Sequence, residues 1–186
     1  MISDLRWLGL VSIVAAVIAA GVPVLGKPLD WQSSVSYTWS GSRRQLLTLA
    51  IVMSLAGAGM CTGLIVWSIP HYHLPELMYG VVAVAYVALM GVAWVPMTEK
   101  PGEHSYLHPH FLGGATLATL AIVAMVSVTW FGLGVPTPAR VLSFSAMVLA
   151  ACWPLLFFSP ARRVFLVFES LIALAFLGTL TLLLIA

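Results

Sequence analysis

The chain has 186 residues, of which 61% are hydrophobic and only 8% carry a charged side chain. A soluble globular domain is about half apolar and about a quarter charged. This composition therefore excludes a soluble domain and predicts a polytopic membrane protein. The formal net charge is +2, and the basic residues form no cluster that would indicate a nucleic-acid partner.

Six apolar runs follow one another along the chain, separated by proline, glycine and charged residues. Each has close to the ~20 residues that a helix needs to cross a hydrocarbon core about 30 Å thick. We expect transmembrane helices at residues 7–25, 45–69, 75–95, 111–133, 141–158 and 164–186. Because the connections are short, consecutive helices should be antiparallel neighbours. The predicted fold is all-α, a compact bundle of six transmembrane helices that takes up residues 1–186 as a single domain.

Basic side chains are distributed unevenly between the two predicted faces of the membrane. Six of the eight fall in the first, third and fifth connections, and two fall on the opposite face. Short cytoplasmic loops carry an excess of lysine and arginine, so these three connections are predicted to be cytoplasmic and both termini to lie outside. The compact loops suit a bacterial inner membrane. Arg43 and Arg44, like Arg162 and Arg163, stand at helix ends, where we expect contact with anionic lipid headgroups.

The five histidines form two groups, one in the stretch "HYH" at 71–73 and the other in "EHSYLHPH" at 103–110. The third predicted span separates them, so they should lie on opposite faces of the membrane, about 30 Å apart. A single five-histidine centre is therefore excluded. Retinal is not expected either, since its Schiff-base lysine must lie within a helix and both lysines, Lys27 and Lys100, lie in connections.

The second histidine group has the spacing of a metal site. His104 and His108 stand at i and i+4, so on one helical turn their imidazoles could hold a divalent transition metal. His110 follows in the expected first turn of the fourth span, where it is a candidate catalytic residue. The alternative that the sequence favours is simpler: these histidines are polar interfacial residues around a Pro-Gly turn.

Glu169 is the acidic residue placed more than one turn inside a predicted span, whereas Glu76 stands at the edge of one. A charge at that depth costs on the order of 2–3 kcal/mol and usually has a partner facing the bundle interior. An ion pair with an arginine is the favoured interpretation. Proton exchange with His110, or completion of a metal site, would make Glu169 the second candidate catalytic residue.

Gly59 and Gly63 form a GxxxG step in the second span. Small residues one turn apart let two helix backbones approach closely in lipid. We expect this face to pack within the chain rather than to form a homodimer, with the small residues at 113–118 of the fourth span as its neighbour.

Three stretches resemble a prokaryotic family of six-helix membrane proteins of unknown function that is related to the DRAM/Sfk-type membrane proteins. They are "VSYTWSGSRRQLLTLAIVMSLAGAG" at 35–59, "GVAWVP" at 91–96 and "HPHFLGGATLA" at 108–118. The chain departs from the family pattern in the end of its first loop and in having three histidines where the family has one. The resemblance implies six helices and a role in a membrane, and it implies no established reaction.

The sequence favours a non-enzymatic role, as an accessory, assembly or lipid-interacting subunit whose partners are membrane lipids and other membrane subunits. It contains no strong nucleophile motif, and apart from Glu76 at the edge of the third predicted span, only Glu169 places a carboxylate inside a span. One alternative is a membrane-embedded metal- or histidine-dependent lipid hydrolase that uses His104, His108, His110 and Glu169. Another is a pigment- or haem-contacting subunit of an electron-transfer complex.

Overall fold

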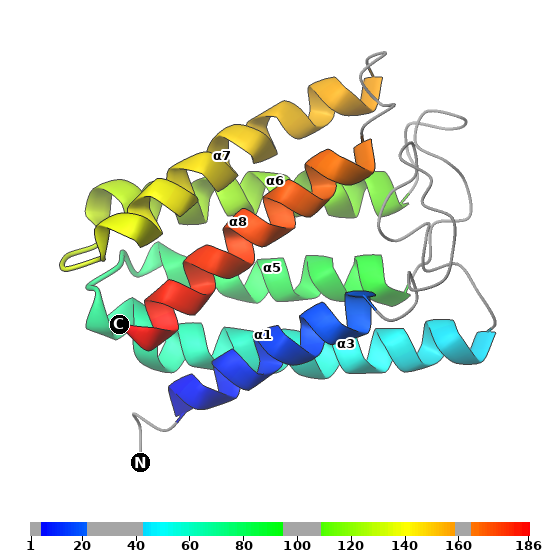
Figure 1. The fold of residues 1–186 in the computed structure, drawn as a ribbon, viewed down its shortest axis with the longest axis horizontal. Coiled ribbons are helices and arrows are strands. Elements are labelled where there is room, and N and C mark those ends of the chain that lie inside the picture. Colours follow the sequence, from blue (N-terminus) through cyan, green and yellow to red (C-terminus); the bar gives the residue numbers. More distant parts are fainter. Residues whose placement is uncertain (1–4, 22–42, 95–108, 159–164) are drawn as a thin grey trace.

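The computed structural model describes residues 5–21, 43–94, 109–158 and 165–186. Every regular element in these ranges is helical, which confirms the expected all-α fold, and the helices line up as six rods (Figure 1). The rods are α1 (Leu5–Gly21); α3 (Arg43–Gly63), continued by the π-helical η2 (Leu64–Ser68) and α4 (Ile69–His71); α5 (Leu77–Trp94); α6 (Pro109–Val126), continued by the π-helical η3 (Ser127–Phe131); α7 (Thr137–Phe158); and α8 (Phe165–Ile185).

Four helical stretches within the described ranges are long and apolar enough to cross a membrane. They are Arg44–His71, Leu77–Trp94, Leu112–Phe131 and Val167–Ile185, and the apolar helices Leu5–Gly21 and Thr137–Cys152 are shorter. Large apolar side chains also point outward from the bundle. Leu55 and Val87, for example, are each 68% exposed. Such outward faces suit a surrounding of lipid, where apolar side chains need no cover.

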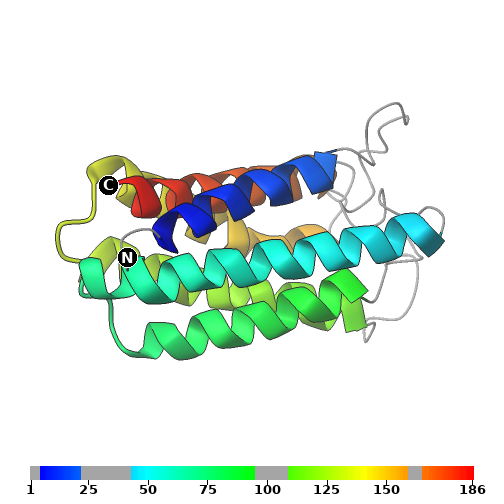
Figure 2. The same ribbon diagram turned by 90° about the horizontal axis from the view of Figure 1, so that it is seen from below.

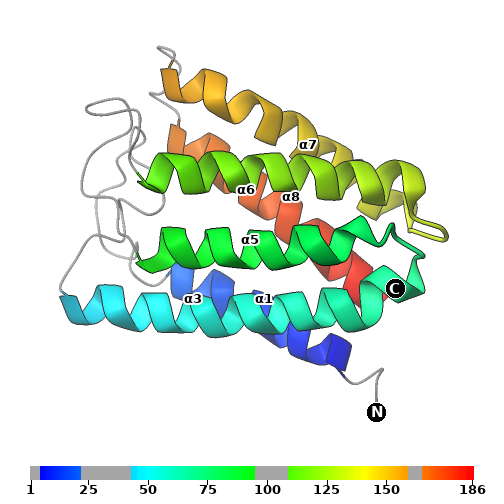
Figure 3. The ribbon, with the colours of Figure 1, turned by 180° about the vertical axis from the view of Figure 1, so that it is seen from behind.

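Consecutive rods are antiparallel neighbours, and α8 returns against α1 to close the bundle. Figure 3 shows α3, α5 and α6 side by side, with α8 crossing behind them at a slant. In Figure 2, α1 and α8 lie together on one face of α3. The starts of α3, α6 and α8 share one end of the bundle, whereas Leu5 and Ile185 share the other (Figure 1).

The small-residue face of α3 packs against α1. A β-carbon on Gly59 would collide with the Ser12 hydroxyl and lie 2.9 Å from Ser12 Cβ. A β-carbon on Gly63 would lie 3.1 Å from Gly9 Cα. The expected neighbour, the small residues at 113–118 of the fourth span, is therefore wrong, and the neighbour is α1. Gly113 faces α5 instead, where a β-carbon on it would lie 2.8 Å from a Val92 methyl group.

The α1–α3 contact has a regular register. Ser12 of α1 lies opposite Gly59 of α3, and Gly9 lies opposite Gly63. The contact therefore moves back three residues along α1 while it moves forward four residues along α3. Ridges spaced by three residues on one helix fit the grooves spaced by four on the other when two helices cross at a shallow angle. One further step along each helix brings Arg6 to the level of Trp67.

Candidate functional site

The metal site predicted at His104 and His108 lies outside the described residues. His110 belongs to the first turn of α6, but its side chain also lies outside the described part of the structure. Within the described ranges, no group of three or more His, Cys, Asp or Glu side chains could hold a metal ion. A metal centre at 104–110 therefore stays a prediction.

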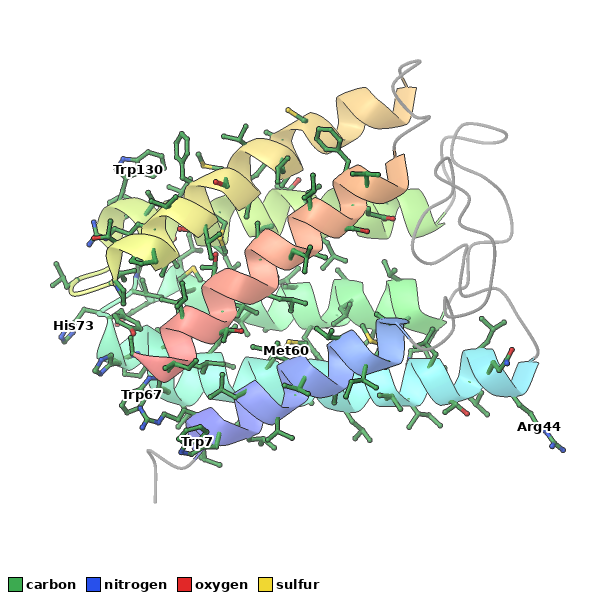
Figure 4. The ribbon with its side chains drawn as sticks, in the orientation of Figure 1. Trp7, Arg44, Met60, Trp67, His73 and Trp130 are labelled. Carbon is green, nitrogen blue, oxygen red and sulfur yellow. The ribbon has the colours of Figure 1, made fainter. Side chains whose placement is uncertain are left out.

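The basic pairs expected to contact lipid headgroups are described only in part. Arg43 begins α3 and Arg44 is exposed beside it, at the far right of Figure 4. Arg162 and Arg163 lie outside the described residues. Glu169 lies in the second turn of α8, where it is half-buried and has an interaction partner. The lipid role of the arginines and the chemical role of Glu169 stay predictions.

The opposite end of the bundle holds an arrangement that the sequence did not reveal. The guanidinium carbon of Arg6 lies 4.9 Å from the centroid of the Trp67 ring and 5.4 Å from that of Trp7. Both distances are within the ~6 Å over which a cation is attracted to an aromatic face. Trp67 in turn stacks on His71, with ring centroids 4.6 Å apart and planes 14° from parallel. We call Arg6, Trp7, Trp67 and His71 the tryptophan cluster (Figure 4).

Local structure explains how the cluster forms. Trp67 and His71 are four residues apart on continuous helix, so their side chains are neighbours on one face. Trp67 lies in the π-helical segment η2, a type of segment frequent at functional sites. Arg6 stands one turn before Gly9, and Trp67 one turn beyond Gly63, so the glycine contact between α1 and α3 brings them together. Tryptophans near span ends are common as interfacial rings, so the sequence gives no sign of their partner, which only the register identifies.

Two hydrogen-bond donors of this cluster lack an acceptor among the described residues. Arg6 Nε and Trp67 Nε1 are both buried without a hydrogen-bond partner in this part of the chain, and so is the hydroxyl of nearby Tyr72. Leaving a buried polar group unsatisfied costs about 1–3 kcal/mol. Arg6 and Trp67 thus each have a buried donor, one of them on a cationic group, that the described residues leave unsatisfied.

The "HYH" histidines have structural roles. His73 has a φ of 49°, and its N–H donates to the Pro70 carbonyl while the Leu74 N–H donates to the Ile69 carbonyl. These two bonds form the Schellman motif, with His73 in the left-handed position that ends the helix. Histidine is among the non-glycine residues that tolerate this conformation best. His71 is the ring on which Trp67 stacks.

Arg140, at the same end, is engaged by backbone carbonyls. Its Nη2 donates to Gly132 O at 2.8 Å, Nη1 to Thr129 O at 3.3 Å, and Nε to Val135 O at 3.3 Å. The guanidinium therefore joins the end of η3, the following turn and the start of α7. These bonds give Arg140 a structural role in holding the 132–136 connection.

Comparison of the chain with protein-family models, with curated proteins and with solved structures finds no match. The resemblance to a six-helix membrane family stays a prediction.

Proposed function

We propose that this chain is an integral membrane protein of a bacterial inner membrane and acts as a non-enzymatic accessory, assembly or lipid-interacting subunit. The observation that carries the proposal is the combination of four helical stretches long and apolar enough to cross a bilayer with large apolar side chains on their outer faces. Such faces are stable against lipid tails or against the apolar faces of a partner subunit.

Hydroxyl groups in the helices support a structural role. Ser54 donates to Ala50 O at 2.7 Å, Thr62 to Ala58 O at 2.9 Å and Thr179 to Ala175 O at 2.8 Å. Each of these protons is directed to a carbonyl four residues earlier in the same helix. The hydroxyl donors are thereby satisfied within their own helices, as an apolar environment requires. This bonding suits a role in packing better than a role in proton transfer.

Membrane insertion is tested by expressing the chain with a tag and washing the isolated membranes with alkaline carbonate. An integral protein stays in the membrane pellet, and release into the wash would overturn the proposal. Purification in mild detergent, followed by native mass spectrometry, then tests the subunit role. We expect retained lipids or a stoichiometric partner, whereas a lipid-free, partner-free protein that hydrolyses lipid would overturn the non-enzymatic assignment.

A second candidate function is the metal- or histidine-dependent lipid hydrolase. It is favoured by one observation: α6 and α8 begin at the same end of the bundle, so His110 and Glu169 share that end. Metal analysis of the purified protein, with and without the substitutions His104→Ala and His108→Ala, tests it. His73→Ala is the matched control, since His73 lies at the other end. Bound metal lost only in the first two variants would support the hydrolase.

A further inference from the structure

We propose that Arg6 and Trp67 form a binding site for a phosphate group, supplied by the headgroup of a membrane lipid. The inference rests on the proposed membrane insertion and goes further by naming a site and a ligand class. It is also separate from the headgroup contacts expected of Arg43, Arg44, Arg162 and Arg163, because Arg44 lies at the opposite end of the bundle (Figure 4).

The first argument is the pair of unsatisfied donors. Arg6 Nε and Trp67 Nε1 are buried N–H groups for which residues 5–21, 43–94, 109–158 and 165–186 supply no acceptor. The guanidinium carbon lies 4.9 Å from the Trp67 ring centroid. Both groups can only donate, since neither guanidinium nor indole has an acceptor atom. The complementary ligand is therefore an oxygen acceptor. A cationic donor prefers an anionic acceptor, because charge-assisted hydrogen bonds are roughly twice as strong as neutral ones.

The second argument is preorganisation. The glycine contacts of α1 and α3 fix the level of Arg6 against Trp67, and the stacking of Trp67 on His71 holds the indole in place. The Arg6 guanidinium also lies over the Trp7 ring. Binding of a ligand to these donors therefore costs the protein little additional side-chain freedom.

The third argument is location. The cluster stands at the end of Arg44–His71, a stretch long and apolar enough to cross the membrane, and Trp7 beside it is 56% exposed. Tryptophan is enriched at the level of the lipid headgroups, where phosphates are the abundant anions. Free phosphate offers the same chemistry, so an experiment has to separate the two sources.

Native mass spectrometry of the detergent-purified full chain provides the test. The protein is titrated with phosphatidylglycerol, with diacylglycerol of the same acyl chains, and with inorganic phosphate. We expect one phosphatidylglycerol to bind with an affinity that Arg6→Gln lowers about tenfold, as the loss of a charged hydrogen bond implies. Diacylglycerol should bind more weakly because it lacks the phosphate. Binding of inorganic phosphate that depends on Arg6, without a preference for the lipid, would overturn the lipid assignment.

Two further variants control for folding and for bulk charge. Trp67→Phe keeps an aromatic ring for His71 to stack on and removes only the indole N–H, so affinity should fall about threefold. Lys27→Gln removes one positive charge from the first connection, where no headgroup contact is assigned, and should leave this affinity unchanged. Equal affinity of the wild type and Arg6→Gln would overturn the site, and so would equal losses in Arg6→Gln and Lys27→Gln. A chain that carbonate washes off the membrane would instead overturn the proposed function.

Discussion

Gly63 of α3 lies directly against Gly9 of α1, so closely that a β-carbon on Gly63 would be 3.1 Å from Gly9 Cα and from a Leu184 methyl group. Such contacts between backbones are possible only where both residues lack a side chain. The contact sets the register that carries Arg6 to Trp67. Packing of these two glycines thus determines which side chains meet one turn further on, at the end of the bundle.

Substituting Gly63 with valine should destabilise the protein and separate Arg6 from Trp67. Forcing extra carbons into a packed contact costs about 1–3 kcal/mol, which thermal unfolding in detergent will measure. Gly80→Ala is the matched control, since nothing lies within 4 Å of the β-carbon it would add. Its melting temperature should equal that of the wild type or exceed it slightly. Equal stability of Gly63→Val and the control would contradict the packing.

Arg140→Met should loosen the connection at 132–136. The variant keeps much of the side-chain volume but leaves the carbonyls of Thr129, Gly132 and Val135 without their charged donor. Hydrogen bonds to a charged group are worth about 1.5–3 kcal/mol, so we expect a loss of that order in unfolding free energy. Hydrogen exchange should accelerate at 132–136, and Arg44→Met, at an exposed position, should change neither quantity.

Tyr72→Phe should leave the protein as stable as the wild type or stabilise it near neutral pH. Tyr72 is 2% exposed, and its buried hydroxyl has no hydrogen-bond partner, so removing the oxygen removes an unsatisfied group. Unfolding temperatures of the two proteins in detergent at about pH 7 provide the comparison. A marked loss of stability in Tyr72→Phe would show that the hydroxyl has a partner, such as a bound ligand.

The same residue should give the protein a pH dependence in alkaline solution. Burial raises the pKa of the Tyr72 phenol above its ordinary value of about 10. Above that pH the unfolded chain releases the phenol proton while the folded chain keeps it. The stabilising contribution is therefore complete below about pH 10 and is lost as the pH rises toward the folded pKa. Melting temperatures measured from about pH 8 to 11 should fall more steeply for the wild type than for Tyr72→Phe.

His73→Gly should stabilise the turn between α4 and α5. His73 has a φ of 49°, a region that costs a residue with a β-carbon about 1 kcal/mol and costs glycine almost nothing. His73→Val should be destabilising, because β-branched residues are the least tolerant of this region. Chemical denaturation of both variants checks the order of stability, glycine above histidine above valine. A metal-binding or catalytic role for His73 would instead appear as a loss of metal binding or activity in both variants.

Orientation can be tested with single cysteines in a chain whose own Cys61 and Cys152 are replaced by alanine. Glu76 and Arg44 are both exposed, at opposite ends of the bundle. If both termini lie outside the cytoplasm, a membrane-impermeant maleimide added to whole cells should label Glu76→Cys and not Arg44→Cys. Both should react after permeabilisation. The reverse pattern in whole cells would place the termini in the cytoplasm.

Local sequence signals were sufficient to predict some helix boundaries and insufficient to predict others. The helical class followed from the apolar runs, and α5 begins at Leu77, after Pro75, as proline punctuation suggests. The second span was expected to end at residue 69, just before Pro70, yet helix continues through Pro70 to His71. The π-helical η2 changes the bonding pattern just before it, so Pro70 stands in the first turn of α4, where its missing N–H costs little.

The candidate site depended on contacts between segments far apart in the sequence. Gly59 and Gly63 were recognisable as a packing face, but the neighbour expected for it, the small residues at 113–118, was wrong, because α1 lies there. Trp67 stands near the end of a predicted span, where tryptophan is commonly an interfacial ring. Arg6 was only one of the two basic residues counted on the outer face. Nothing within either segment indicates that these two side chains meet, because their contact follows from the α1–α3 register.

By itself the sequence determined that the described chain is helical, and that several of its helices are apolar and long enough to cross a membrane. Composition and run length decide these properties locally, through the need to satisfy every backbone hydrogen bond in an apolar surrounding. The tertiary structure alone decided which helix faces meet. Helices that are apolar on nearly all sides present no polar stripe from which a buried face could be identified. The partner of each face, and with it the pairing of Arg6 and Trp67, is therefore set by the fit of small and large side chains across the bundle.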